Sequence, residues 1–212
     1  MSSPAPSLRR RPEAERRQIY AALVDVCLER GFPGASLELV IERAAVDRPT
    51  FNRHFSDLGD CFGQYIAEAL IAFVDEIEVA AADEEAWRTQ VRNAVQAMVR
   101  FCRADEARAH MLLVETLAAG PLGQLIRDRA LEKVTEVIDR GRLLMDDPTL
   151  LTRLTAEAMA GALFSQMHRT MEQGILGEAD DLVPQLMYCV VLPYLGVEAA
   201  VEELSPPPFA EP

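Results

Sequence analysis

The chain has 212 residues, half of them hydrophobic and 26% charged, with a net charge of −13. This composition supplies enough apolar side chain for a buried core and excludes a globally disordered chain. We find no run of about 18 apolar residues, and residues 1–12 lack the apolar middle of a secretory signal, so we expect a cytoplasmic protein with no membrane span.

Charge is distributed unevenly along the chain. Residues 1–60 carry nine arginines and nine acidic residues, so the whole net charge of −13 lies in residues 61–212. An acidic surface repels a polyanion. The second part is therefore a poor partner for nucleic acid, whereas the first part remains free to bind one.

The four cysteines lie far apart, at Cys27, Cys61, Cys102 and Cys189, with no CxxC and no paired Cys/His spacing. Neither a zinc module nor a disulfide framework is indicated. We expect reduced thiols in the core, no metal and no cofactor.

The first elements predict a flexible arm and three helices. Residues 1–12 are rich in Pro and Ser and end in three arginines, which is typical of a flexible basic arm. From residue 13 to 30, apolar residues recur at spacings of three and four, and Gly31 follows as a stop. Ser36 and Asp47 are good N-caps for two short helices that follow.

Two short helices joined by residues 44–47 follow the plan of a helix-turn-helix unit. The third helix of such a unit lies in the major groove, and its polar side chains contact bases and phosphates. Phe51 and Phe55 would anchor that helix inward. The residues whose chemistry suits DNA are Arg48, Thr50, Asn52, Arg53 and His54. An ordinary short helix with a solvated basic side is the alternative.

The rest of the sequence is long and helical. Apolar periodicity predicts helices over 57–82 and 87–102, one that begins near 107 and ends at the sequence AAGPLG, and others over 122–144, 149–173 and 180–203. Pro193 is expected to kink the last of them. No strand-like alternation stands out, so we predict an all-α fold of about nine helices, with a disordered tail over 205–212.

Residues 16–62 resemble the DNA-binding domain of the tetracycline-repressor (TetR) family of transcriptional regulators. The matching positions are Arg16 and Ile19 opening the first helix, Gly31-Phe32 closing it, Ser36 starting the second, Ala44 and Val46 at the turn, and Pro49-Thr50-Phe51 followed by Arg53-His54-Phe55. LLVETLAAGP, residues 112–121, is similar to a stretch found in many members.

The resemblance implies a ligand-responsive regulator, most often a repressor, that binds a palindromic double-stranded DNA operator as a homodimer. Pro49 would join the DNA-contacting residues, with Arg16 and Ser36 near phosphate. A DNA-binding domain over 13–56 would precede a ligand-binding and dimerisation domain over 57–204.

Three positions depart from the family's usual pattern. The family usually has Tyr where Asn52 stands, Lys where Leu58 stands, and Gly where Ala45 stands. A lost phosphate contact weakens binding to any DNA sequence, and Ala45 is tolerable only if its φ is not strongly positive. We expect DNA binding with altered specificity, with Arg9, Arg10 and Arg11 replacing some lost contacts.

A ligand pocket and a dimer interface are expected in the second domain. Mixed aromatic and methionine surfaces suit a small apolar or aromatic ligand, and the candidate lining residues are Trp87, Met98, Phe101, Cys102, His110, Met111, Glu115 and Met145. The last two long helices would form a two-fold interface through Met159, Ala160, Gly161, Leu163, Phe164, Met167, Leu186, Met187, Val190, Val191 and Tyr194. Ordinary core packing is the alternative for both sets.

Two other functions remain open at this stage. A protein- or ligand-binding module could keep a degenerate helix-turn-helix that no longer binds DNA. A helical enzyme or carrier could use an apolar cavity for a lipid or acyl group. No carboxylate pair or Ser/His/Asp set has a spacing that demands catalysis, so we expect a protein that is not an enzyme.

Overall fold

A computed structural model describes residues 6–82, 86–176 and 181–204. Every regular element in these ranges is helical, which confirms the prediction of an all-α chain. The α-helices are α1 (Pro6–Arg30), α2 (Leu37–Arg43), α3 (Arg48–Asn52), α4 (Leu58–Ala82), α5 (Trp87–Ala104), α6 (Glu106–His110), α7 (Thr116–Ala118), α8 (Gly120–Asp139), α9 (Arg153–Glu172) and α10 (Leu182–Leu204). A π-helical turn, Met111–Glu115, joins α6 to α7, and 3-10 turns lie at Phe32–Gly34, Arg140–Leu144 and Pro148–Leu150.

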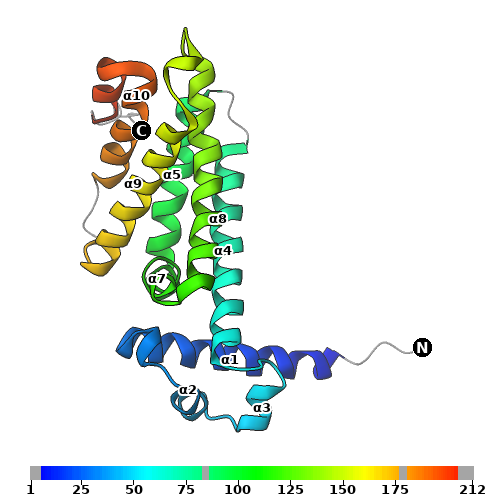
Figure 1. Ribbon diagram of the computed structural model, residues 1–212. Helices are drawn as coiled ribbons and strands as arrows, with labels where there is room; N and C mark the ends of the chain where they lie inside the picture. Colours follow the sequence, from blue (N-terminus) through cyan, green and yellow to red (C-terminus); the bar gives the residue numbers. More distant parts are fainter. Residues whose placement is uncertain (1–5, 83–85, 177–180, 205–212) are drawn as a thin grey trace, which may run out of the picture.

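The long helix α4 connects the two parts of the molecule (Figure 1). Helix α1 lies across the lower end of α4, with α2 and α3 beneath it. Above, α4 packs against α5 and α8, α9 packs on α8, and α10 packs on α5. The molecule is therefore a small three-helix unit set at one end of a helical body.

One apolar face of α4 explains this role. Its buried residues recur at spacings of about four, which places them on one side of a helix, and they are Cys61, Phe62, Ile66, Ala69, Leu70, Phe73, Ile77 and Ala81. In the lower part, Phe62 packs against Phe32 with ring centroids 4.0 Å apart. In the body, Phe73 meets Phe101 edge-on at 5.2 Å. The same face thus contributes to both parts of the molecule.

The expected basic arm is in part helical. Helix α1 begins at Pro6, so the prediction of flexible chain is wrong for residues 6–12, while residues 1–5 lie outside the described ranges. Pro6 takes the first helical position, where its fixed φ suits a helix, and leucine, arginine, alanine and glutamate are good helix formers. The predicted tail over 205–212 lies outside the described residues.

Helix α10 departs from expectation in two ways. Its break lies at Gly196, with φ 83° and ψ 179°, rather than at Pro193, which stays inside the helix. Only glycine takes that conformation readily. By length and composition, α10 is also the one described helix apolar enough to cross a membrane, which the sequence analysis missed. A core helix passes the same test, and Leu186 and Val190 of α10 are buried within the fold.

Three of the four cysteines are buried, as expected for core thiols, but Cys189 is exposed on α10. Its outward position is a correction, because the apolar sequence around it did not show which side of α10 meets the body. Burial raises the pKa of Cys27, Cys61 and Cys102 to about 12, so these thiols stay protonated at neutral pH.

Candidate nucleic-acid interface

Side-chain caps fix the starts of α2 and α3. The hydroxyl of Ser36 accepts a hydrogen bond from the N–H of Leu39 at 3.3 Å. The carboxylate of Asp47 accepts one from the N–H of Thr50 at 2.8 Å. Hydrogen bonding from Thr50 holds the pKa of Asp47 below its ordinary value. The two caps predicted from the sequence are therefore present, and they set where each helix begins.

The turn between α2 and α3 is a Schellman C-cap built on alanine. The N–H of Val46 donates to the carbonyl of Ile41 at 3.1 Å, which is the six-to-one bond of that motif. The residue between helix and turn, Ala45, has φ 50°. Alanine thus takes the left-handed conformation where the TetR family usually has Gly, because this cap requires that conformation whichever residue occupies it.

Aromatic residues anchor α3 from behind. Phe51 and Phe55 are buried, with ring centroids 5.4 Å apart. Tyr20 of α1 packs against Phe55 at 5.4 Å. Gln18 of α1 also donates to the carbonyl of Ala44 at 2.6 Å, which ties the turn to the same helix. The unit is therefore held as one piece by α1.

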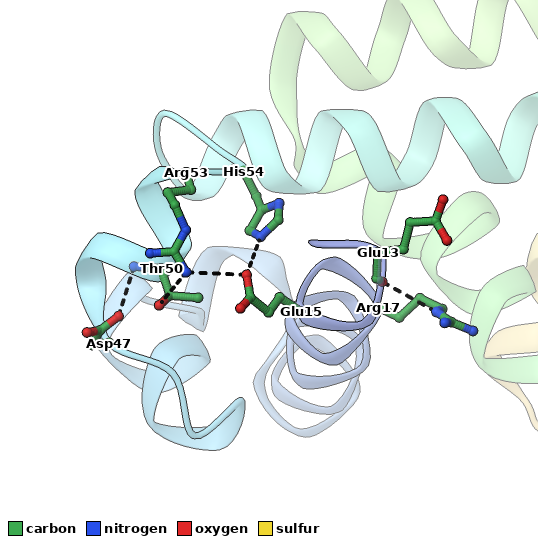
Figure 2. Close-up of polar contacts among 7 residues, drawn as sticks. All are labelled: Glu13, Glu15, Arg17, Asp47, Thr50, Arg53 and His54. Carbon is green, nitrogen blue, oxygen red and sulfur yellow. Dashed lines mark hydrogen bonds and ion pairs between the residues drawn. The ribbon is translucent and has the colours of Figure 1, made fainter. Parts of the chain in front are cut away.

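Two of the predicted DNA-contacting side chains lie toward α1 (Figure 2). One carboxylate oxygen of Glu15 lies 3.1 Å from Nε2 of His54 and accepts a hydrogen bond from Arg53 at 3.3 Å. Arg53 also donates to the hydroxyl of Thr50 at 3.1 Å. His54 is 11% exposed and Arg53 is 56% exposed. Of these two residues, only Arg53 presents substantial surface to a ligand outside the unit.

Glu15 was missed by the sequence analysis. It lies on α1, 38 positions before Arg53, and no local spacing links them. The remaining predicted contacts on α3 point outward: Arg48, Pro49 and Asn52 are exposed. Arg48 forms an ion pair with Glu38 of α2, and both side chains are more than half exposed. Arg48, Arg53 and His54 are thus each paired with a glutamate.

Arg16 lies at the junction of α1 and α4. Its guanidinium donates to the hydroxyl of Tyr20 at 2.8 Å and to Gln64 at 3.2 Å, and it pairs with Glu68. It also lies over the Tyr20 ring, 5.1 Å from the centroid. These contacts join α1 to α4 at Arg16.

The body contains a small apolar cavity of about 30 Å³, about the space of one or two waters. It is enclosed by α4, α5, the π turn, α8 and α9. Of the residues predicted to line a ligand pocket, Met98 and Cys102 line this cavity, and Arg127 is the charged residue of its wall. Residues assigned to other roles or overlooked complete the wall, among them Phe73, Leu112, Leu113, Ile126, Ala160, Phe164 and Met167.

The other predicted pocket residues lie elsewhere. Trp87 donates to the carbonyl of Val137 at 3.0 Å and meets Tyr194 edge-on at 5.2 Å, away from the cavity wall. Phe101 packs on Phe73, while His110, Met111, Glu115 and Met145 do not line the cavity. These residues lie in the core or at the junction of the two parts, and composition alone does not distinguish such positions from a pocket.

The predicted dimer residues are mostly interior. Eight are buried within one protomer, namely Ala160, Leu163, Met167, Leu186, Met187, Val190, Val191 and Tyr194. They cannot offer surface to a second copy, so this part of the assignment is corrected. Met159, Gly161 and Phe164 are partly exposed. Because α9 and α10 are apolar on most sides, the pattern did not show which side meets the body.

No protein-family model matches the chain. Among solved structures, the fatty acid degradation regulator FadR from Bacillus halodurans is similar with a TM-score of 0.69 and 17% identity, covering 91% of this chain and 97% of that one. FadR from Bacillus subtilis, solved with stearoyl-CoA, is similar with a TM-score of 0.66 and 16% identity. The match covers 85% of this chain and 98% of that one. A TetR-like regulator from Rhodococcus sp. RHA1 is similar with a TM-score of 0.67 and 21% identity. The match covers 84% of this chain and 94% of that one. The chain therefore has the TetR-like fold.

Proposed function

We propose that the protein is a cytoplasmic, non-enzymatic transcriptional regulator that binds a palindromic operator as a homodimer and responds to a small apolar ligand. The observation that carries the proposal is the outward face of α3. Arg48, Pro49 and Asn52 are exposed on a helix that is capped at its start and anchored from behind by Phe51 and Phe55. A rigid exposed helix of this kind can enter a major groove.

The ion pairs of the unit are compatible with this role. The Arg48–Glu38 pair is exposed on both sides, and such pairs contribute only about 0–1 kcal/mol. Arg48 can therefore leave Glu38 for phosphate or a guanine edge at small cost. Glu15 holds Arg53 and His54 in place, so Arg53 would meet DNA through its exposed N–H groups while His54 supports it.

The cavity favours an apolar chain carrying an anionic group. Its wall is apolar except for Arg127, which is 37% exposed and pairs with Asp128 at 3.1 Å. At about 30 Å³ it is smaller than a ligand, so occupancy requires the wall side chains to move. The proteins from B. halodurans and B. subtilis, one named for fatty acid degradation and the other solved with stearoyl-CoA, support an acyl ligand.

For the dimer we propose the outer sides of α9 and α10. On α9 the exposed positions Ala158, Ala162 and Ser165 follow helical spacing, and small side chains allow a second helix to approach closely. On α10, Cys189 is exposed and Leu192 is partly exposed. The repressor role follows what is commonest for this fold family.

Selection of bound sequences from a random duplex pool at ~0.1 M salt tests the proposal. We expect wild type to enrich a palindrome and Arg48→Ala to abolish or re-specify it, while Arg140→Ala, an exposed arginine at the far end of the body, enriches the same sequence. No enrichment from a folded dimer would favour the alternative, a binding module whose helix-turn-helix no longer meets DNA.

A further inference from the structure

Glu115 links the body directly to the helix-turn-helix unit. Its carboxylate is buried and accepts a hydrogen bond from the backbone N–H of Phe32 at 2.6 Å. The other carboxylate oxygen lies 3.3 Å from Nε2 of His110. Phe32 lies just past the end of α1, four residues before the cap of α2. The contact therefore spans 83 positions of sequence and ends at the base of the unit.

The turn that carries Glu115 also forms part of the cavity wall. Leu112 and Leu113 line the cavity, and both lie in the π turn Met111–Glu115. The backbone N–H of Thr116 donates to the carbonyl of Met111, five residues back, which is the spacing of a π turn, and the Thr116 hydroxyl donates to the same carbonyl at 3.0 Å. One short segment thus touches the cavity on one side and Phe32 on the other.

A π turn has one residue more per hydrogen-bonded ring than an α-helix, so a return to α-helical spacing would shift the register of the residues around it. Such a shift would rotate Glu115 relative to Phe32. Burial and the nearby Glu115 charge together raise the pKa of Cys27 on α1.

We propose that Glu115 is a positioning residue that couples occupancy of the apolar cavity to the helix-turn-helix unit. A ligand that displaces Leu112 and Leu113 shifts the π turn and breaks the Glu115–Phe32 hydrogen bond. The link between α1 and α2 then loosens, and α3 loses its fixed position relative to the body. This inference rests on the proposed regulatory function for its consequence at DNA, but the contact itself is measured without DNA.

Hydrogen exchange at the Phe32 amide tests the coupling in the full chain. Dodecanoate is the probe, and Ala130→Phe, which places a ring in the cavity wall, mimics occupancy without any ligand. In wild type we expect either change to speed exchange of Phe32 by about tenfold. In Glu115→Ala exchange is fast from the start, and neither dodecanoate nor Ala130→Phe raises it further. Glu106→Ala, an exposed glutamate on α6, should behave like wild type.

Slow Phe32 exchange in folded Ala130→Phe would overturn the proposal, as would equal responses to dodecanoate in wild type and Glu115→Ala. If Ala130→Phe does not fold, the dodecanoate comparison decides. If dodecanoate does not bind, Ala130→Phe decides. Failure of the regulatory function is a separate result: it appears as no enriched duplex in the pool selection, whatever Phe32 does.

Discussion

Two ion pairs, one in each part of the molecule, differ in how far they are buried. In the helix-turn-helix unit, the side chains of Arg48 and Glu38 are 53% and 69% exposed. In the body, the side chain of Glu203 is 2% exposed and pairs with both Arg88 and Arg92. Exposed pairs are weak and exchangeable, whereas a buried carboxylate depends on its partners. The exposed Arg48–Glu38 pair can open so that Arg48 binds another partner, and the buried Glu203 holds α10 on α5.

The largest expected effect is on the buried pair. Glu203→Ala should lower the free energy of unfolding by about 2 kcal/mol, below the usual range for a broken buried pair because Arg88 and Arg92 are 28% and 38% exposed and can be rehydrated. Urea denaturation measures it. Glu202→Ala is the control: Glu202 pairs with Arg88 at 2.9 Å but is 66% exposed, so its loss should cost under about 0.5 kcal/mol. Equal costs would remove the contrast between exposed and buried ion pairs.

The exposed pair should matter for DNA and little for folding. Arg48→Ala should weaken binding to a duplex selected by the wild-type protein by about tenfold or more. Glu38→Ala should strengthen it a few-fold, because it frees Arg48 and removes a negative charge near phosphate. Fluorescence anisotropy measures both. The prediction is contradicted if Glu38→Ala weakens binding while the protein stays folded.

The turn between α2 and α3 should gain stability from glycine. Ala45 has φ 50°, and an L-residue there costs about 1–2 kcal/mol. Glycine removes this cost, but its larger entropy when unfolded cancels part of the gain. We expect Ala45→Gly to raise the free energy of unfolding by about 0.5–1 kcal/mol in urea denaturation. Ala44→Gly is a matched control that should be destabilising, because Ala44 is buried with φ −74°. A destabilised Ala45→Gly would contradict the assigned cap.

The smallest effect concerns the cap of α3 and pH. Hydrogen bonds from Thr50 lower the pKa of Asp47 from 3.8, so the carboxylate contributes stability above pH 3.8 and loses it as the pH falls through the lower folded value. The difference in urea midpoint between wild type and Asp47→Ala should be constant from pH 7 to 5 and shrink below pH 3.8. A difference that persists unchanged to pH 2 would show that the ionised carboxylate is not the capping group.

Local signals predicted the unit well. Ser36 and Asp47 act within three residues of the groups they cap, so the sequence alone identifies them. Burial of Phe51 and Phe55 likewise follows from helical spacing. The φ of Ala45 escaped prediction because the geometry of the cap, and not the preference of alanine, decides it.

Contacts between distant segments were out of reach. Glu15 meets Arg53 from another helix, and Glu115 meets Phe32 across the two parts of the molecule. Periodicity gives the buried side of a helix only when the other side is polar. Helix α9 is apolar or small on both sides, so Ala160 and Met167 were assigned to a dimer interface while they line the cavity.

The helix-turn-helix unit lies within residues 1–60, which carry no net charge, and it should bind DNA although the whole chain carries a charge of −13. The most direct measurement is the affinity for a duplex of about 25 base pairs, long enough for two half-sites one turn apart, as salt is raised from about 0.05 to 0.2 M. We predict that the logarithm of the binding constant falls linearly with the logarithm of salt, and that Arg48→Ala reduces the slope by about one. Affinity that does not change with salt, or no retention of DNA by a folded dimer at the lowest salt, would contradict the account.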